Sequence, residues 1–386
     1  MIDFELSEEQ RVLQASVRDM CERLIVPNAR RWDAEEKFPH EVIPALGEMG
    51  LLGMQIPEAY GGAGMKFHDY VIALEEVAHA DASIGLTMAS HNSLCTGHIY
   101  LAANEAQKKK YLPRLASGKS LGAWGLTEPG SGSDAGAART RAVRKGDKWS
   151  ITGTKTFITQ GSVAEIYVVL ASTDPDKKAK GLTAFIIEKG TPGFRTGKRI
   201  EKMGLHASDT TELVLEEVEV GDEQRLGELG HGFFDTLRIL DKGRIGIGAW
   251  SIGIGRAAFE AALRYAKERV QFDKPIAEFQ AIQHMLADMA TELDAARLLV
   301  WRAAWMQDQG RRTTAESSIA KYYAARATMR ACNAAVQIHG GYGYTREFDV
   351  ERYLRDARLA QIGEGTDEVQ KMVIARELLR EAAEMG

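Results

Sequence analysis

Residues 148–159 read KWSITGTKTFIT, and this stretch decides the fold class of the chain. It is rich in β-branched and aromatic residues, which favour strands. Three runs of similar composition follow, each bounded by Gly, Asp or Pro: IYVVLAST (166–173), LTAFIIE (182–188) and TELVLEEVEV (211–220). Short β-rich runs at such spacing predict an antiparallel β domain over residues 121–231.

Helical patterns flank this segment on both sides. Ser7 and Gln10 in SEEQ fit a capping box. Apolar residues then recur on one helix face: Leu13, Val17, Met20 and Leu24. Later in the chain, four long patterns follow one another and predict a helix bundle: 233–270, 277–309, 314–338 and 346–381. Because helices, strands and helices come in that order, a doubly wound parallel sheet is not expected. We expect three domains, over residues 1–120, 121–231 and 232–386.

Length and composition limit the classes of protein to consider. The chain has 386 residues, 45% of them hydrophobic, which is more than one core usually holds. A formal net charge of -5 gives no reason to expect a nucleic acid or an anionic membrane as partner. Cys21, Cys95 and Cys332 lie far apart and form no CxxC pair, which argues against disulfides and cysteine metal sites.

The N-terminus, MIDFELSEEQRVLQ, is acidic and polar, unlike a secretory signal or a transit peptide. The sequence contains no run of 18 apolar residues, so no membrane span is expected. We therefore expect a soluble, cytoplasmic protein, or a mitochondrial matrix protein if the source is eukaryotic and a transit peptide has been removed.

Two glycine-rich stretches look like dinucleotide-binding loops but fail the test of context. EPGSGSDAG (128–136) is followed by strand and turn residues, whereas a Rossmann loop needs a helix whose N-terminus meets the pyrophosphate. GIGRAA (253–258) lies inside a helical run, where glycines allow close packing. The first stretch is either a surface loop or a place where backbone approaches a ligand, with the hydroxyls of Thr127 and Ser133 nearby.

Helix ends carry further candidates for ligand binding. Arg269, in ERVQF (268–272), can bind a phosphate or complement a helix dipole. The glycine-dense stretch QIHGGYGYTREF (337–348) is either a plain connection or a ligand contact.

Other catalytic classes find no support in the sequence. His91, His231 and His284 have no neighbour at ligand spacing, so no metal site is expected. No GxSxG motif supports a hydrolase.

Six stretches, taken together and in order, resemble the acyl-CoA dehydrogenase family: LTEPGSGSDAG (126–136), GTKTFITQG (153–161), LDKGR (240–244), ERVQF (268–272), QIHGGYG (337–343) and EGTDEVQ (364–370). PEAYGGAGM (57–65) and the order of helices and strands extend the resemblance to the whole chain. Membership implies an α+β multidomain fold: an N-terminal helical domain, a middle antiparallel β-barrel-like domain and a C-terminal four-helix bundle. It also implies a homotetramer, or a homodimer, that binds FAD, oxidises an acyl-CoA to the trans-2-enoyl-CoA and passes electrons to electron-transferring flavoprotein.

The resemblance assigns residues to two sets of contacts. The FAD contacts that it implies are Trp124, Leu126, Thr127, Ser133, Phe157, Ile158, Thr159, Arg269, Gln271, Phe272, Gln280, Gln337, Gly340, Gly341, Thr366 and Glu368. Of these, the segment from Gln337 to Gly341 would come from a neighbouring subunit. The contacts to the CoA substrate that it implies are Ser133, Asp241, Arg244 and Gly365.

Glu364 aligns with the catalytic base of the family. It lies between Gly363 and Gly365, where a helical pattern is interrupted. Without the resemblance, a loop carboxylate in water would be the simpler interpretation. The reaction needs a base for the α-proton and a flavin for the β-hydride. Burial away from cations would raise the pKa of the carboxyl toward the working pH. The glycines would let the amide of Glu364 approach the thioester oxygen as part of an oxyanion hole.

Three glycines stand at positions where relatives carry functional side chains. Gly243 stands where some relatives carry the base, so Glu364 is the only candidate in either place. Gly363 stands where short- and medium-chain relatives commonly have Tyr, which predicts a pocket that tolerates branched, cyclic or longer acyl groups. Gly85 falls near the Arg of glutaryl-CoA-specific relatives, which disfavours a dicarboxylate.

Two alternatives stay open at this point. The same fold serves acyl-CoA oxidases, which use dioxygen, although this chain is shorter than typical oxidases. A catalytically silent scaffold is the second alternative, and the presence of Glu364, Arg269 and LTEPGSGS argues against it.

Overall fold

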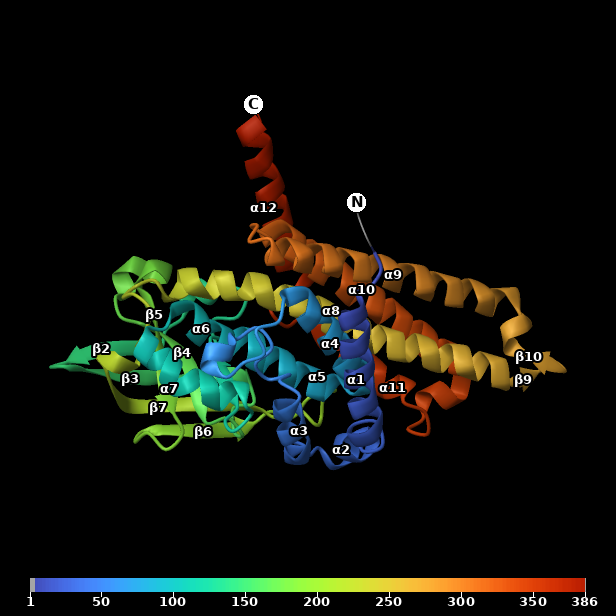
Figure 1. Cartoon of the computed structure of the whole chain (residues 1–386), viewed down its shortest axis with the longest axis horizontal. Coiled ribbons are helices and arrows are strands. Elements are labelled where there is room, and N and C mark those ends of the chain that lie inside the picture. Colours follow the sequence, from blue (N-terminus) through green and yellow to red (C-terminus); the bar gives the residue numbers. More distant parts are fainter. Residues whose placement is uncertain (1–3, 386) are drawn as a thin grey trace.

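The computed structural model describes residues 4–385. It places the large sheet, within residues 122–226, at one end of an elongated molecule, and the helices after residue 232 extend toward the other end (Figure 1). The helices before the sheet are α1 (Glu8–Leu24), α2 (Ala29–Glu35), α3 (Ile43–Glu48), α4 (Phe67–Ala80), α5 (Ala82–Ala89), α6 (Gly97–Ala102) and α7 (Glu105–Ala116). The predicted capping box of Ser7 and Gln10 is present at the start of α1. On α1, Val17 and Met20 are buried as predicted, whereas Leu24, in the last turn, is 40% exposed.

A π-helical segment, Ser90–Thr96, joins α5 to α6. His91 in it is fully buried, and its Nδ1 accepts a hydrogen bond from the backbone amide of Gly122 at 3.1 Å. That contact ties the helical domain to the first strand. No pattern in the sequence predicted this segment.

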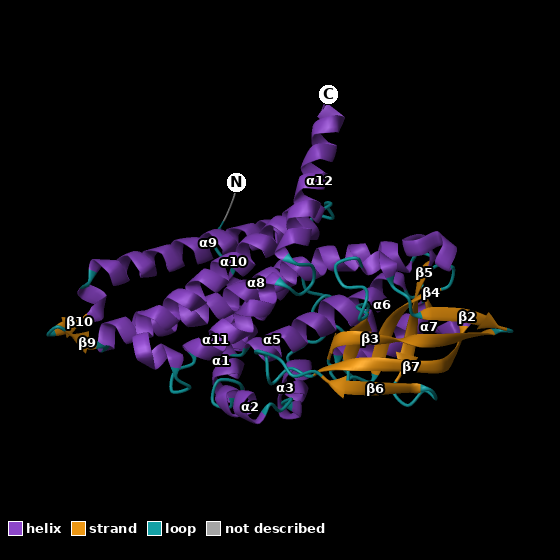
Figure 2. Cartoon of the chain, turned by 180° about the vertical axis from the view of Figure 1, so that it is seen from behind, coloured by secondary structure: helices purple, strands orange, loops and turns teal. Residues whose placement is uncertain are grey.

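Eight strands form one sheet in the middle of the chain: β1 (Gly122–Gly125), β2 (Arg141–Lys145), β3 (Lys148–Thr159), β4 (Ile166–Ser172), β5 (Leu182–Glu188), β6 (Phe194–Arg199), β7 (Thr210–Gly221) and β8 (Arg225–Leu226). The order is β6-β7-β3-β2-β4-β5-β8, with β1 beside β4. Figure 2 shows β6 at one edge of the sheet, with β7 and then β3 next to it. The prediction of an antiparallel sheet holds for most pairs. It is wrong for β4, which pairs in parallel with β1 over four residues and with β2 at one. The long β2–β3 hairpin between β1 and β4 permits this crossover.

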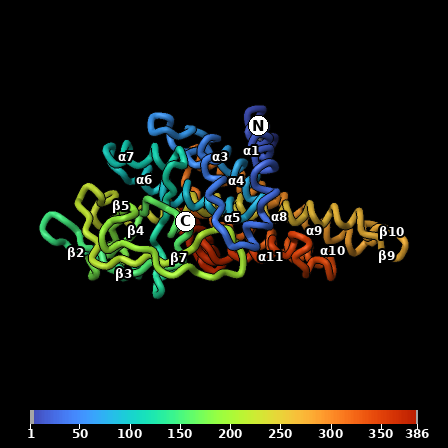
Figure 3. The backbone as a smooth tube through the Cα atoms, turned by 90° about the horizontal axis from the view of Figure 1, so that it is seen from below, coloured from blue at the N-terminus to red at the C-terminus, as the bar shows by residue number. Residues whose placement is uncertain are grey.

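Five helices follow the sheet: α8 (Gly232–Glu268), α9 (Gln280–Asp308), α10 (Thr314–His339), α11 (Val350–Ala357) and α12 (Asp367–Met385). A hairpin of two short strands, β9 (Val270–Gln271) and β10 (Lys274–Pro275), joins α8 to α9. The stretch GIGRAA lies within α8, so its predicted helical context is confirmed. One hydrophobic core connects α1 to α5, the sheet and α8 to α11, and a second cluster packs α6 and α7 against the sheet. Figure 3 shows the sheet at one end of the molecule and the β9–β10 hairpin at the other.

The fourth helix of the bundle differs from the prediction of one pattern over residues 346–381. Between α11 and α12 the chain forms a short 3-10 helix, Arg358–Gln361, and then a turn. Glu364 (φ 52°) and Gly365 (φ 97°) adopt left-handed backbone conformations that an α-helix cannot include. Helix α12 then projects from the rest of the molecule (Figure 1). None of the described helices combines the length and the apolar character that a membrane span needs.

Candidate active site

A cavity of about 1290 Å³ lies where the three parts of the chain meet. It collects residues from the π-helical segment, from β1 and β3, from α8 and from the turn before α12. Twelve of the residues assigned from the sequence line it: Trp124, Leu126, Thr127, Ser133, Phe157, Ile158, Thr159, Asp241, Arg244, Glu364, Gly365 and Thr366. Segments more than 200 residues apart in sequence therefore form one site, as the resemblance implies.

Glu364 presents its carboxylate to this cavity from a strained turn. Its φ of 52° places a non-glycine residue in the left-handed region, which costs free energy and is common at functional sites. One carboxylate oxygen, Oε2, is buried and has no hydrogen-bond partner among the described residues. Gly243 of α8 makes room for it, since a Cβ at that position would lie 2.2 Å from Oε2.

Burial raises the pKa of Glu364 to about 7, against the smaller opposing effects of Arg244 and Lys321. The expectation of a carboxyl without a cation nearby is wrong, because Arg244 and Lys321 both act on the carboxylate. Desolvation of the charged form still outweighs both of them. At neutral pH the carboxyl is therefore poised between its protonated and ionised forms.

Two buried residues outside the predicted site hold the turn. Gln370 of α12 donates through Nε2 to the carbonyl oxygens of Glu364, at 3.1 Å, and of Gly365, at 3.0 Å. Lys321 of α10 donates through Nζ to the Gly365 carbonyl at 2.6 Å. A signal for Lys321 exists in the sequence, since it interrupts a stripe of small residues, Ser317, Ala324 and Thr328, that shares one face of α10.

Arg244 and Asp241 lie one helical turn apart on α8. Arg244 donates to Asp241 Oδ1 at 2.9 Å, and Thr314 donates to Asp241 Oδ2 at 2.7 Å. The Nε of Arg244 is buried without a partner in the described part of the chain. The pair thus presents a cation, oriented by a carboxylate, to the cavity wall.

Phe157 owes its position to an irregularity in the sheet. The pairing of β3 with β7 shifts register between Lys155 and Ile158, and Phe157 has a φ of 57°. Phe157 is 64% exposed and lines the cavity, so its ring is accessible to a ligand there.

An ion pair between Lys155 and Glu128 anchors the segment after β1. Fully buried Lys155 donates to the Leu126 carbonyl at 3.1 Å and to Glu128 Oε1 at 2.8 Å. Glu128 also accepts from the backbone amides of Arg139 and Thr140. The glycine-rich loop is therefore fixed against β3 while its other side borders the cavity.

The cavity fits an aromatic cofactor with polar edges. Its wall offers the ring of Phe157 and the indole of Trp124 as flat apolar surfaces. The hydroxyl of Ser208, which also lines the cavity, is buried without a partner within residues 4–385. A Cβ at Gly132 would meet no atom within 4 Å, so backbone there borders open space. These features suit the isoalloxazine ring and ribityl chain of FAD.

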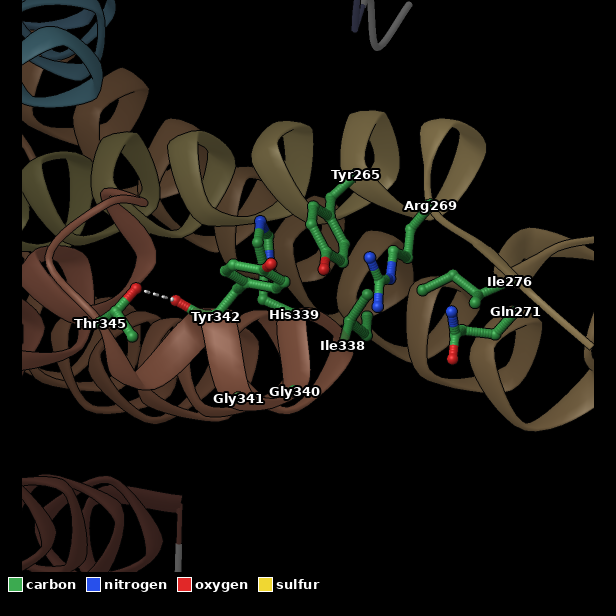
Figure 4. Close-up of a pocket in the computed structure, with 10 residues that line it drawn as sticks. All are labelled: Tyr265, Arg269, Gln271, Ile276, Ile338, His339, Gly340, Gly341, Tyr342 and Thr345. Atoms are coloured by element: carbon green, nitrogen blue, oxygen red, sulfur yellow. Dashed lines mark hydrogen bonds between the residues drawn. The ribbon is translucent and has the colours of Figure 1, made fainter.

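A second, smaller cavity of about 500 Å³ lies at the far end of α8 (Figure 4). It brings together four residues assigned to FAD: Arg269, Gln271, Gly340 and Gly341. The resemblance assigns the two glycines to a neighbouring subunit, which stays a prediction; within this chain they border the same cavity as Arg269. The guanidinium of Arg269 lies over the ring of Tyr342, 5.6 Å from its centroid, so it is held facing the cavity.

Four assigned residues line neither of the two cavities: Phe272, Gln280, Gln337 and Glu368. All four are exposed to solvent, and Phe272 is 88% exposed at the tip of the β9–β10 hairpin. Their assigned roles stay predictions. Within residues 4–385, no group of three or more His, Cys, Asp and Glu side chains is arranged to hold a metal ion.

Comparison with known proteins matches the chain in three consecutive parts. Residues 7–119 match the acyl-CoA dehydrogenase N-terminal domain, residues 123–218 the middle domain and residues 230–379 the C-terminal domain. An acyl-CoA dehydrogenase of Bacillus subtilis is 46% identical over 374 residues, which cover 97% of this chain and 99% of that protein.

Two solved structures are similar over nearly the whole fold. The butyryl-CoA dehydrogenase of Megasphaera elsdenii has a TM-score of 0.96 and 43% identity, covering 98% of this chain and 100% of that one. A structure described as the electron transferring flavoprotein of Acidaminococcus fermentans, studied for flavin-based electron bifurcation, contains a chain with a TM-score of 0.97 and 44% identity, with the same coverage. Three domain matches, full-length identity and a shared fold agree: the chain belongs to the acyl-CoA dehydrogenase family of FAD-dependent oxidoreductases.

Proposed function

We propose that this enzyme removes one hydrogen from Cα and one from Cβ of an acyl-CoA thioester, giving the trans-2-enoyl-CoA, with Glu364 as the base. The observation that carries the proposal is the Glu364 carboxylate, buried in a large cavity with an unpartnered oxygen and a pKa near neutrality. A carboxyl of this kind accepts a proton more readily than one in water.

The chemistry divides between the chain and its cofactor. FAD, when bound, supplies the two-electron oxidant that accepts the β-hydrogen as hydride. Glu364 takes the α-proton, and the electron pair left at Cα becomes part of the new double bond. The Glu364 amide, exposed by the flanking glycines, donates to the thioester oxygen, where negative charge develops during proton removal.

Residues around the cavity suit the two ligands. Trp124, Leu126, Thr127, Phe157, Ile158 and Thr159 would hold FAD from the side of the sheet. Arg244 and Asp241 would orient the CoA part of the substrate, because a buried guanidinium held by a carboxylate is a rigid hydrogen-bond donor.

Gly363 bears on which acyl groups the cavity accepts. Gly363 lines the cavity beside Glu364, and a Cβ there would come no closer than 3.5 Å to Leu359. We infer that branched, cyclic or longer acyl groups are accepted. Relative kcat/KM for butyryl-CoA, isobutyryl-CoA and octanoyl-CoA tests this inference, and a steep preference for butyryl-CoA alone would contradict it.

We also infer that electron-transferring flavoprotein reoxidises the enzyme, that the enzyme is a homotetramer and that it acts in the cytoplasm. The electron-transferring flavoprotein named for the Acidaminococcus structure supports the first inference. An acyl-CoA oxidase is the alternative. Rapid reoxidation by air after anaerobic reduction with acyl-CoA would favour the oxidase, and slow reoxidation the dehydrogenase.

The deciding experiment compares the wild-type enzyme with Glu364→Gln. The variant keeps the shape of the side chain but cannot accept the proton, so kcat is expected to fall by at least ~10³-fold. Its FAD absorbance and acyl-CoA affinity should be retained. Full activity of the variant with an artificial electron acceptor would refute Glu364 as the base.

A further inference from the structure

Lys321 is a fully buried lysine in the first third of α10. The other fully buried lysine of the described chain, Lys155, forms a salt bridge with Glu128 at 2.8 Å. Lys321 instead donates to a main-chain carbonyl, that of Gly365, at 2.6 Å. An ammonium group buried without a carboxylate at contact distance costs stability. Folding alone therefore does not account for this residue.

The hydrogen bond of Lys321 is partly redundant. Gln370 already donates to the same Gly365 carbonyl, and it also reaches the carbonyl of Glu364. A neutral side chain thus satisfies the backbone of the turn on its own. Unlike Gln370, Lys321 also brings a positive charge close to Glu364.

Charged and titratable groups from four helices act on this small volume. Tyr70 comes from α4, Arg244 from α8, Lys321 from α10, and Asp367 and Glu368 from the start of α12. Burial lowers the pKa of Lys321 to about 8, opposed mainly by Asp367 and Glu364. Lys321 and Arg244 in turn lower the pKa of Glu364 against its burial. Arg244 is already engaged by Asp241, so Lys321 is the cation whose main partner is the turn itself.

We propose that Lys321 is a positioning residue for the base, fixing the Glu364–Gly365 turn and favouring the ionised carboxylate through its charge. This inference rests on the proposed role of Glu364. It assigns separate tasks to the two donors: Gln370 holds the shape of the turn, and Lys321 holds both its shape and its electrostatic environment.

The proposal gives the reaction a pH profile with two limbs. As pH rises, kcat/KM rises while Glu364 ionises, and it falls again when Lys321 loses its proton. Replacing Lys321 by Met removes the cation, so ionised Glu364 becomes less favourable. The midpoint of the rising limb should move up by about 0.5–1 pH unit, and the decrease of kcat/KM at high pH should become smaller.

The experiment uses FAD-loaded wild-type enzyme, Lys321→Met, Lys321→Gln and Gln370→Leu. It measures kcat/KM for butyryl-CoA, or for the best acyl-CoA of the panel, from pH 5.5 to 9.5 with an artificial acceptor. Lys321→Gln keeps a donor without the charge, so we expect the same midpoint shift with a smaller loss of kcat. Gln370→Leu is the matched control, expected to lower kcat at an unchanged midpoint. Thermal unfolding should show no loss of stability in Lys321→Met, since a buried charge has been removed.

Each outcome decides one of the two proposals. A wild-type enzyme that oxidises no acyl-CoA refutes the proposed function itself. If the wild type is active and both Lys321 variants keep its pH midpoint, the inference about Lys321 is overturned and the proposed function stands. If Lys321→Met fails to fold, the midpoint of Lys321→Gln alone decides.

Discussion

Glu364 is the residue at which stability and function oppose each other. Its pKa is about 7 in the folded chain and near 4.5 when unfolded. Between these values the folded state keeps a proton that the unfolded state has released, so the free energy of unfolding falls as pH rises from 4.5 to 7. Above pH 7 the Glu364 carboxylate is ionised in both states, and the full cost of burying its charge lowers the free energy of unfolding.

Glu364→Gln should therefore stabilise the enzyme, and only at the higher pH. We expect a gain of about 2 kcal/mol in the free energy of unfolding at pH 8, reduced from the full shift because the side chain borders an open cavity. At pH 5 the gain should be small. Thermal unfolding of both holoenzymes at the two pH values measures it, and an equal difference at both would contradict the assigned pKa.

Gly243 should be intolerant of even the smallest side chain. A Cβ there would lie 2.2 Å from Glu364 Oε2, so the carboxylate must move. Because small misplacements of a catalytic group are costly, Gly243→Ala should lower kcat about 10–100-fold with FAD still bound. Gly363→Ala, whose Cβ would be 3.5 Å from Leu359, is the matched control and should keep most of its activity. Similar kcat values for both variants would rule out the steric explanation.

At the residue scale, the sequence predicts which side chains meet but not what surrounds them. The motif around Glu364 leads to the proposed base, and Asp241 and Arg244 lie with it in one cavity. Lys321 and Gln370 escape detection because their importance comes from burial beside a turn that folds from a distant segment. Desolvation is a property of the assembled site, so no local pattern carries it.

At the scale of elements, the strand β3 joins the sheet to the cavity through Lys155. Lys155→Met would leave the buried carboxylate of Glu128 without its cation, which costs about 3–5 kcal/mol. Lys148→Met on the same strand removes an exposed pair with Glu219 and should cost less than about 1 kcal/mol. Urea unfolding of the two variants measures the difference. Equal midpoints would show that the buried pair is not needed to hold the loop after β1.

Residue composition and turn residues are enough to predict the strands β3, β4, β5 and β7, because β propensity is local. The parallel pairing of β1 with β4 is not predictable in this way, since it depends on which distant strand lies alongside. The break before α12 shows the same limit. Two glycines interrupt the periodic pattern, but the positive φ of Glu364 occurs in a turn whose carbonyls accept hydrogen bonds from Lys321 and Gln370, which belong to other parts of the fold.

At the scale of the whole molecule, α12 carries apolar side chains that the chain itself leaves uncovered. Met372 and Leu379 are 72% and 73% exposed on a helix that projects into solvent (Figure 1). We expect another copy of the chain to bury them. Leu379→Glu should reduce the molar mass measured by light scattering after gel filtration, whereas Glu381→Gln on the same helix should not. An unchanged mass for Leu379→Glu would place the subunit contacts elsewhere.

The length of α8 has a consequence for how much enzyme is active at a given concentration. Gly243 and Arg269 are 26 residues apart along it, which corresponds to about 39 Å at 1.5 Å per residue. One extended FAD is shorter than this, so residues at both ends can share a cofactor only if the two ends belong to different copies. Cofactor binding and subunit association are then linked by mass action. Dilution should release FAD before it unfolds the chain, and the apparent affinity for FAD should rise with protein concentration.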